Sequence, residues 1–240
     1  MIVVHQQPYL MRLNKFLAHA GVASRRKCDD LISRGFVTIN NKICLDYSYK
    51  VTNDDCVRVN KEIVNLNNEK IVYVLNKPKG VISTVSDDRN RATVIDFLPN
   101  EHRLFPIGRL DRDTTGVLLI SNDGELSNKL THPRYGVEKI YIATTYVNLN
   151  KSKLYDVRNG IKLDDGSIAY AKILFIKKLK KKFIWKIFLK EGKKREIKRI
   201  FTTLGSKIID LHRESFAGIK IGNLKPGKYR RLKKHEIPKF

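Results

Sequence analysis

Residues 108–124 constrain the fold of this chain more than any other stretch. Polar and charged residues fill the first half, and a short apolar run, 117–120, follows directly. Because Gly116 precedes that run and Ser-Asn-Asp-Gly follows it, we predict a buried strand that ends in a turn. Asp111 then lies on the loop that leads into a rigid strand, between two arginines. A carboxylate placed there is a candidate for chemistry, although a turn residue or an ion-pair partner of Arg109 would give the same pattern.

The charge of the chain indicates a polyanionic partner. Among 240 residues, 48 Lys and Arg stand against 24 Asp and Glu, which leaves a formal net charge of +24. Nucleic acid or an anionic membrane surface would match such an excess. No apolar stretch of the sequence approaches the roughly 20 residues of a membrane span, and the basic residues are not gathered on one amphipathic helix. We therefore expect a nucleic-acid partner, no membrane association and, without a secretory signal, a cytoplasmic protein.

Cysteine and histidine show no metal-ligand pattern. Cys28, Cys44 and Cys56 contain no Cys-x-x-Cys pair, and the six histidines are scattered. Structural metal sites depend on closely spaced ligands, so we predict no metal site. Three widely spaced cysteines also suit a reducing compartment.

The first sixty residues predict a small domain of two helices and short strands. Apolar residues at helical spacing end at Gly21, and Ser24 can cap a second helix. Asn40 and Asn41 can both adopt the positive φ of a tight hairpin turn. We predict an N-terminal tail over 1–10, a small domain over 11–62, a linker over 63–70 and a larger domain over 71–240.

Strands and helices alternate irregularly in the larger domain. We expect strands at 71–75, 117–120, 139–147, 168–176, 183–189, 208–209 and 219–221, helices at 125–130 and 151–158, and a hairpin tip at 177–182. A further amphipathic helix closes at Gly205, and its first turns are predicted to carry Lys193, Lys194, Arg195, Lys198 and Arg199. Cations at a helix N-terminus oppose the helix dipole. This placement favours an anion-binding role, with a merely solvated basic helix as the alternative.

Several segments together resemble a known enzyme family. Arg-Leu-Asn-Lys-Phe-Leu, Gly-Val-Ala-Ser-Arg-Arg and Ile-Ser-Arg-Gly-Phe-Val-Thr-Ile-Asn, within residues 11–60, resemble the S4 RNA-binding domain. The segments 75–81, 108–124, 131–141 and 191–201 resemble, in order, the motifs of pseudouridine synthases. Over residues 11–236 the chain is similar to the RsuA/RluB type, which acts on bacterial ribosomal RNA. The resemblance implies an α+β protein: a small S4-type α/β domain, then a catalytic domain built on a mixed, mostly antiparallel β-sheet with flanking helices.

The resemblance also implies roles for three side chains. Asp111 matches the nucleophilic carboxylate of the family, which attacks either the ribose C1′ or the base C6, or relays a proton; the sequence leaves these routes open. Tyr141 matches an aromatic residue that stacks on the flipped uracil and can take the C5 proton. Lys198 matches a basic residue that keeps the carboxylate ionised. The alternatives are Asp113 as the nucleophile, Tyr141 as a plain strand aromatic and Lys198 as one more phosphate-binding cation.

Other cations are expected to bind the RNA. Arg109 resembles an arginine that fills the gap left by the flipped base. The remaining predicted RNA-binding residues are Lys15, Arg25, Arg26, Lys77, Lys79, Arg195 and Arg199. The implied reaction is an isomerisation without a redox step, so no metal and no organic cofactor is expected. We expect a monomer that acts on ribosomal RNA, with 23S favoured and 16S second; the competing hypothesis is a non-catalytic RNA-binding ribosome-assembly factor.

Overall fold

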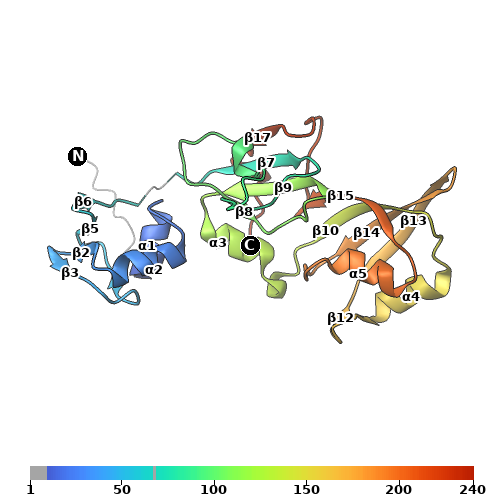
Figure 1. Ribbon diagram of the computed structural model, residues 1–240, viewed down its shortest axis with the longest axis horizontal. Helices are drawn as coiled ribbons and strands as arrows, with labels where there is room; N and C mark the ends of the chain where they lie inside the picture. The colour runs from blue at the N-terminus through green and yellow to red at the C-terminus, as the bar shows by residue number, and fades with distance from the viewer. Residues whose placement is uncertain (1–9, 67–68) are drawn as a thin grey trace. The chain divides into compact units, whose positions relative to one another are not determined.

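The computed structural model describes residues 10–66 and 69–240, and the chain forms two compact units, 1–70 and 71–240 (Figure 1). Residues 1–9 of the predicted tail and residues 67–68 of the predicted linker lie outside the described residues. Within the described ranges, no helix has both the length and the apolar character that crossing a membrane requires.

The first unit packs two helices against short strands. Helix α1 spans Leu13–His19 and α2 spans Arg25–Ser33. The Ser24 hydroxyl accepts the Lys27 amide hydrogen at 3.2 Å, which confirms the predicted cap. Strands β2 (Val37–Ile39) and β3 (Lys42–Ile43) form the predicted hairpin, with φ of 51° at Asn40 and 68° at Asn41. Strand β1 (Met11–Arg12) pairs with β4 (Lys50–Val51) in a separate ribbon.

A second hairpin of this unit enters the segment that was predicted as linker. Strand β5 (Val57–Val59) pairs with β2 and with β6 (Glu62–Ile63), so the sheet order is β3-β2-β5-β6. Val64 and Leu66 pack against the core of the first unit. The prediction that the linker begins at residue 63 is therefore wrong, because the turn-forming residues before β6 make a hairpin and leave the following apolar side chains on the core.

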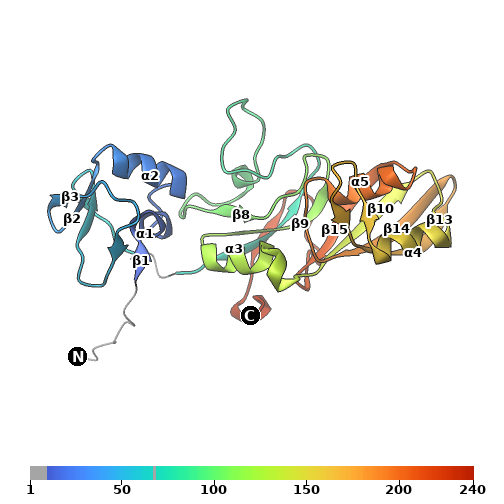
Figure 2. The same ribbon diagram turned by 90° about the horizontal axis from the view of Figure 1, so that it is seen from below.

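A nine-stranded sheet forms the second unit (Figures 1 and 2). Its main path is β13-β14-β10-β15-β9-β7-β17, with β16 beside β15 and β8 beside β9. Only the β15–β9 pair is parallel among the described strands, which confirms a mixed, mostly antiparallel sheet. The strands are β7 (Val72–Lys77), β8 (Phe105–Ile107), β9 (Thr115–Ser121), β10 (Lys139–Thr145), β13 (Lys172–Leu179), β14 (Lys182–Leu189), β15 (Ile208–Phe216), β16 (Ile219–Lys220) and β17 (Tyr229–Arg231).

Helices and turns complete the unit. They are α3 (Gly124–Thr131), α4 (Lys151–Asn159), α5 (Glu196–Thr203) and 3-10 turns at Ile95–Phe97, Pro133–Tyr135 and Lys234–Glu236. A separate ribbon joins β11 (Ile161–Lys162) and β12 (Ile168–Ala169). The Asn150 side chain accepts the Lys153 amide hydrogen at 3.0 Å and caps α4.

Strand β9 is buried on both faces, which explains its continuous apolar run. Successive side chains of a strand point to opposite faces. Val117 and Leu119 pack in a cluster that contains the α3 residues Leu126 and Leu130, whereas Leu118 and Ile120 belong to a second cluster. That second cluster contains the buried side of α5. The strand that follows the Asp111 loop is thus fixed from two sides.

Strand pairing overrides two local predictions. Strand β13 continues to Leu179, and β14 begins at Lys182. The hairpin turn is therefore at 180–181, whereas a tip over 177–182 was predicted. Strand β7 continues through Lys77, where a break was predicted from Asn76 onward, because residues 72–77 pair with β9 along their whole length.

Candidate active site

The Asp111 loop joins β8 to β9 through a tight turn. The Thr114 amide donates to the Asp111 carbonyl at 3.0 Å. The Asp111 side chain stays 38 % exposed, although Leu110 and Thr114 beside it are buried. Asp111 therefore stands at the surface of a loop whose neighbouring side chains anchor it to the core.

Ser83 holds the loop from one side. Its hydroxyl donates to the Leu110 carbonyl at 2.9 Å and accepts the Leu110 amide hydrogen at 3.1 Å. This hydroxyl uses its donor and one acceptor position on the residue before Asp111. Sequence reasoning missed Ser83, since a serine in an extended polar segment carries no local signal for such a contact.

Lys77, which was predicted to bind RNA, holds the loop from below, and its side chain does not reach the surface. The side chain is fully buried, and Nζ donates to the carbonyls of Pro78, Arg112 and Thr114 at 3.0–3.1 Å. All three ammonium hydrogens are used. Burial lowers the Lys77 pKa to about 8, with Asp113 and Asp111 opposing that shift and Lys198 adding to it. The signal for this role was the position of Lys77 at the end of a buried strand.

Gly116 allows β9 to approach β15. Its φ is +105°, and a Cβ atom there would lie 2.3 Å from the Arg213 carbonyl oxygen. Gly116 is paired with Arg213 in the parallel ladder, and the Arg213 Nε donates to the Val117 carbonyl at 2.6 Å. A side chain at residue 116 would push apart β9 and β15, and β9 is the strand that follows the Asp111 loop.

The structure brings Asp111, Tyr141 and Lys198 to one pocket. The Lys198 Nζ, on α5, lies 3.3 Å from the Asp111 Oδ2. Tyr141, on β10, is 7 % exposed and lines the same pocket, as do Arg109 and Arg195. We call this the central pocket. It unites a carboxylate, a cation and an aromatic ring from a loop, a helix and a strand.

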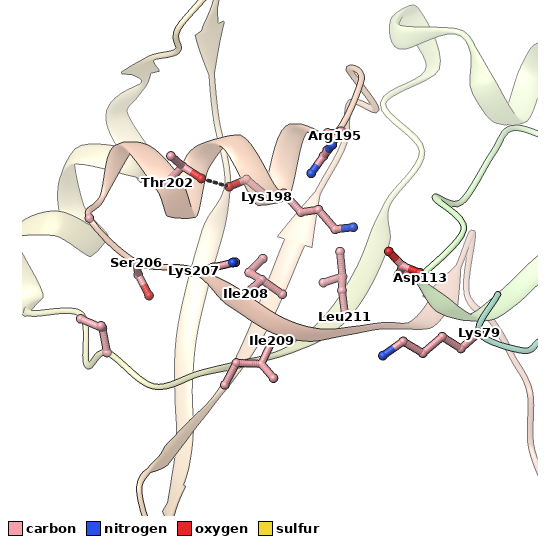
Figure 3. A pocket seen from close by; sticks show the side chains of 12 residues that line it. Lys79, Asp113, Arg195, Lys198, Thr202, Ser206, Lys207, Ile208, Ile209 and Leu211 are labelled. Atoms are coloured by element: carbon pink, nitrogen blue, oxygen red, sulfur yellow. Dashed lines mark hydrogen bonds between the residues drawn. The ribbon is translucent and has the colours of Figure 1, made fainter.

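Asp113 has a different environment. Its side chain is 55 % exposed and lies 3.6 Å from the Arg112 Nε. It does not line the central pocket, and Figure 3 shows it facing a neighbouring groove together with Lys79. The geometry thus favours Asp111 over Asp113 as the group at the reaction centre.

Two basic grooves meet the central pocket. The first, here called the α5 groove, has a volume of about 810 Å³ and is lined by Lys79, Arg195, Lys198 and Lys207 among others (Figure 3). The second, here called the loop groove, lies between residues 82–91, 108–112 and 192–195. Arg195 lines both grooves and the central pocket. An RNA strand that crosses Asp111 would find cations on both sides.

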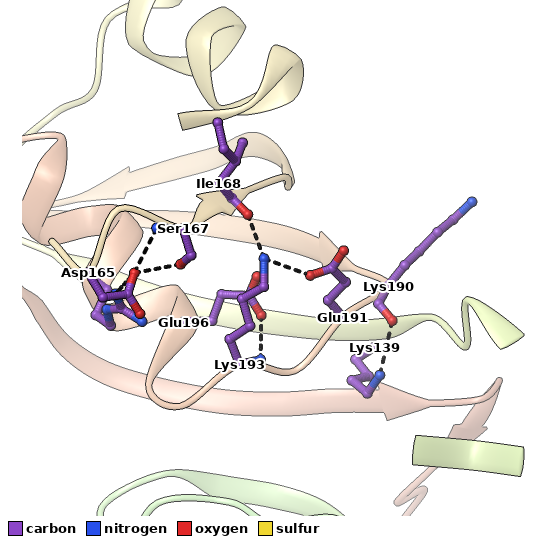
Figure 4. Close-up of polar contacts among 9 residues, drawn as sticks. Lys139, Asp165, Ser167, Ile168, Lys190, Glu191, Lys193 and Glu196 are labelled. Atoms are coloured by element: carbon purple, nitrogen blue, oxygen red, sulfur yellow. Dashed lines mark hydrogen bonds and ion pairs between the residues drawn. The ribbon is translucent and has the colours of Figure 1, made fainter. Parts of the chain in front are cut away.

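Glu196 sets the backbone before α5. It accepts the Lys193 amide hydrogen at 2.8 Å, while its own amide donates to the Lys193 carbonyl at 3.2 Å. Figure 4 shows Glu196 and Lys193 side by side, with the Lys193 ammonium between Glu191 and Ile168. This turn places Arg195 in the left-handed region, with φ 51°. Burial raises the Glu196 pKa, because the carboxylate is 2 % exposed.

Helix α5 begins later than predicted. Lys193, Lys194 and Arg195 precede the helix, and its first residue is the acidic Glu196. The predicted conflict between these three cations and the helix dipole is therefore wrong. Lys193 is half-buried, Lys194 and Arg195 are exposed, and all three line the loop groove.

Arg199 is engaged by acidic residues. Its guanidinium forms ion pairs with Asp164 and Asp165, and the side chain is only 19 % exposed. Asp165 is held in turn by the Ser167 hydroxyl at 2.6 Å (Figure 4). For the predicted RNA-binding role, the Arg199 guanidinium would have to exchange these carboxylates for phosphates.

The remaining predicted cations lie in two places. Lys79 faces the α5 groove, and Arg109 lines the central pocket and the loop groove. Lys15, Arg25 and Arg26 belong to the first unit, where both arginines are exposed at the start of α2. Over residues 10–66 and 69–240, no cluster of three His, Cys, Asp or Glu side chains is arranged to hold a metal ion.

Comparison with known proteins agrees with this geometry. Residues 71–203 match the RNA pseudouridylate synthase family model, and residues 11–55 match the S4 domain. The chain is 42 % identical to "Ribosomal large subunit pseudouridine synthase B" of Bacillus subtilis, over 95 % of both chains. It is 35 % identical to an "Uncharacterized RNA pseudouridine synthase" of Aquifex aeolicus, over 95 % of this chain and 92 % of the relative.

A solved structure shares the whole architecture. A crystal structure described as a pseudouridylate synthase superposes with a TM-score of 0.69 and 28 % identity, covering 95 % of this chain and 98 % of the other. The matched family model includes the Asp111 loop, Tyr141 and Lys198. An N-terminal S4 domain followed by this catalytic fold places the chain in the RNA pseudouridine synthase family.

Proposed function

We propose that the chain converts uridine to pseudouridine in large-subunit ribosomal RNA, with Asp111 as the catalytic carboxylate. The observation that carries the proposal is the 3.3 Å contact between Asp111 Oδ2 and Lys198 Nζ in a pocket that Tyr141 also lines. An ion pair at this distance fixes the orientation of the Asp111 carboxylate within the pocket.

The reaction rearranges one nucleoside and needs no second substrate. The bond between N1 of uracil and the ribose C1′ breaks, the base turns, and C5 bonds to C1′ while the C5 proton leaves and N1 gains a proton. Asp111 can attack C1′ or C6, and both routes demand a partly exposed, ionised oxygen such as Oδ2. The Tyr141 ring offers a flat surface for the base, and its hydroxyl is the candidate acceptor of the C5 proton.

The target uridine must leave its stack to reach Asp111, because a stacked base does not expose C1′ and C6 to a protein carboxylate. Arg109 lines both the central pocket and the loop groove, which suits a side chain that enters the vacated space. Lys79, Arg195 and Lys207 along the α5 groove suit the flanking phosphates. The exposed cations of the S4 unit would add affinity without sequence selection.

The name of the Bacillus subtilis relative supports the choice of RNA. It is a large-subunit enzyme by its printed name, and this chain is 42 % identical to it over 95 % of both chains. We therefore favour 23S over 16S ribosomal RNA. A ribosome-assembly factor without catalysis is the competing function, and it offers no reason to keep Asp111, Tyr141 and Lys198 in one pocket.

Carbodiimide mapping of 23S and 16S transcripts tests the proposal. Each transcript is incubated with the wild-type protein or with Asp111→Asn, and carbodiimide adducts that resist mild alkali are located by primer extension. We expect a resistant adduct in 23S RNA with the wild-type protein only. A new adduct in 16S RNA alone would refute the substrate assignment, and no adduct in either RNA would refute the activity.

A further inference from the structure

The β13–β14 hairpin carries a concentration of positive charge that the active site does not use. Between residues 172 and 189, seven of eighteen residues are lysine and none is acidic. Lys186 has an acidic partner, Glu214, at 2.7 Å. In the part of the chain that the structure describes, the turn lysines 180–182 are exposed and form no ion pair.

The hairpin pairs with β10, and β10 in turn pairs with β15, whose first residues line part of the α5 groove. This part of the groove is lined by Val147, Lys207, Ile208 and Ile209, and Figure 3 shows Lys207 and Ile208 on the segment that follows α5. Thr145, the last residue of β10, pairs with Ile208 on one side and with Phe183 on the other. Phe183 is therefore separated from Ile208, which lines the groove, by the single strand β10.

Phe183 carries a cation on its ring. It pairs across the hairpin with Lys178, whose Nζ lies 5.5 Å from the ring centroid. Phe183 also packs against the same core cluster as Ile208, so both lie on the α5 side of the sheet. An aromatic ring with adjacent lysines is the combination that holds nucleotide bases and phosphates in single-stranded binding sites.

We propose that the β13–β14 hairpin is a second RNA-binding surface of the catalytic unit. The substrate RNA leaves the central pocket along the α5 groove, passes Lys207 and Phe183, and places its phosphates against Lys180, Lys181 and Lys182. The charge of these residues, without acidic neighbours in the hairpin, selects a polyanion over a protein or an apolar ligand. The inference deepens the proposed function, on which it rests for the identity of the RNA.

The lysines of the hairpin could instead protect the edge of the sheet from pairing with other chains, and the test has to distinguish this role from RNA binding. Strand β13 is the edge of the sheet, and Leu174, Phe175, Ile176 and Leu179 are exposed on it. Lysines on an edge strand prevent pairing with other chains. That role would be independent of RNA, and it would leave RNA affinity unchanged when the turn lysines are replaced.

The test measures binding in the Asp111→Asn background to an unmodified in-vitro transcript of Bacillus subtilis 23S ribosomal RNA. The variant is Lys180→Gln/Lys181→Gln/Lys182→Gln, and the control is Lys220→Gln/Lys225→Gln/Lys239→Gln, which removes the same charge from exposed positions elsewhere in the second unit. We expect about tenfold weaker binding for the hairpin variant and a slope of log affinity against log salt smaller by about 2, from three lost contacts. Equal affinity and slope for the two variants would overturn the proposal.

A second measurement locates the contact and separates it from catalysis. A benzophenone amino acid at position 181 is expected to cross-link to the transcript, and the same group at position 225 is not. In the otherwise wild-type chain, the hairpin variant is expected to need about tenfold more protein to reach half of its maximal rate of pseudouridine formation, because the loss is in RNA binding. Absence of pseudouridine with every protein, together with weaker binding of the hairpin variant, would refute the proposed function and leave the hairpin as an RNA-binding surface.

Discussion

The Lys198 Nζ lies 3.3 Å from the Asp111 Oδ2, although the two residues are 87 positions apart in the chain. Asp111 is on the loop that enters β9, and Lys198 is in the first turn of α5. The contact depends on the sheet, because α5 packs on the core cluster that contains Leu118 and Ile120 of β9. Replacing either residue of this ion pair should therefore affect the catalytic rate much more than the affinity for RNA.

Replacement of Lys198 tests what its charge does. Lys198→Met is expected to lower the rate of the chemical step about a hundredfold, because the carboxylate loses its adjacent cation. Affinity for RNA should fall by only a few-fold, since Lys79 and Arg195 remain in the α5 groove. Single-turnover kinetics and filter binding measure the two effects. Lys198→Arg, the control, should recover much of the rate, and equal losses for Met and Arg would contradict a charge-based role.

Lys77 should matter for the loop and not for RNA affinity. Lys77→Met leaves the carbonyls of Arg112 and Thr114 without their donor, which is expected to lower the free energy of unfolding by about 1–3 kcal/mol. The rate should fall, whereas the dissociation constant should stay within twofold. Lys79→Met is the control, and it should show the reverse pattern because Lys79 faces the α5 groove.

The ionisation of Lys77 gives a pH dependence with a defined sign. Its folded pKa, about 8, lies below the ordinary value of 10.5, so the folded state loses this proton first as the pH rises. Between pH 8 and 10.5 the unfolded state binds more protons, and this group therefore adds stability as the pH increases. The difference in unfolding free energy between wild type and Lys77→Met, from urea titrations at pH 7 and 9.5, should shift in favour of wild type at the higher pH. A constant difference would contradict the lowered pKa.

The catalytic rate should fall as the pH rises above 8, whereas the contribution of Lys77 to the unfolding free energy increases over the same range. A neutral Lys77 amine has two hydrogens for three carbonyl acceptors, so the Asp111 loop loses one of its anchors. We expect the single-turnover rate to fall above pH 8, while the Lys77→Met variant lacks this alkaline fall. The pH profiles of the two proteins, each measured at saturating protein, provide the check.

Gly116 should be intolerant of any side chain. Gly116→Ala would place Cβ 2.3 Å from the Arg213 carbonyl oxygen, and we expect a loss of at least about 3 kcal/mol in unfolding free energy. Gly222→Ala is the matched control, because its φ is also positive, at +63°, but no atom lies within 4 Å of the added carbon. That control isolates the backbone cost, about 1–2 kcal/mol. Equal losses in thermal or urea unfolding would refute a steric role for Gly116.

Much of the fold could be predicted from local patterns. Ser24 and Asn150 place side-chain oxygens at the starts of helices, and Asn40 with Asn41 has the composition of a tight turn. These helix starts and this turn depend only on residues that are close in sequence. The extent of β7 and of β13–β14 could not be predicted in the same way. Those ends depend on pairing with strands distant in the chain.

In the candidate site too, the residues within recognisable motifs could be predicted, whereas the contacts from distant parts of the chain could not. Asp111, Tyr141 and Lys198 could be named because their surrounding motifs resemble a family. Sequence shows the charge of Lys77 but not the carbonyls of residues 112 and 114 that converge on it. In the same way, sequence shows the charge of Arg199 but not Asp164 and Asp165, which approach it from another part of the chain.

The most direct test of the central claim is tritium release from 23S transcript labelled at C5 of uridine, under single-turnover conditions, with Asp111→Asn beside wild type. Asn keeps the size of the side chain and removes the attacking carboxylate. We predict rapid release by wild type, no release above background by Asp111→Asn, and dissociation constants within a few-fold of each other. Release by Asp111→Asn at the wild-type rate would contradict the assignment of Asp111 as the catalytic group.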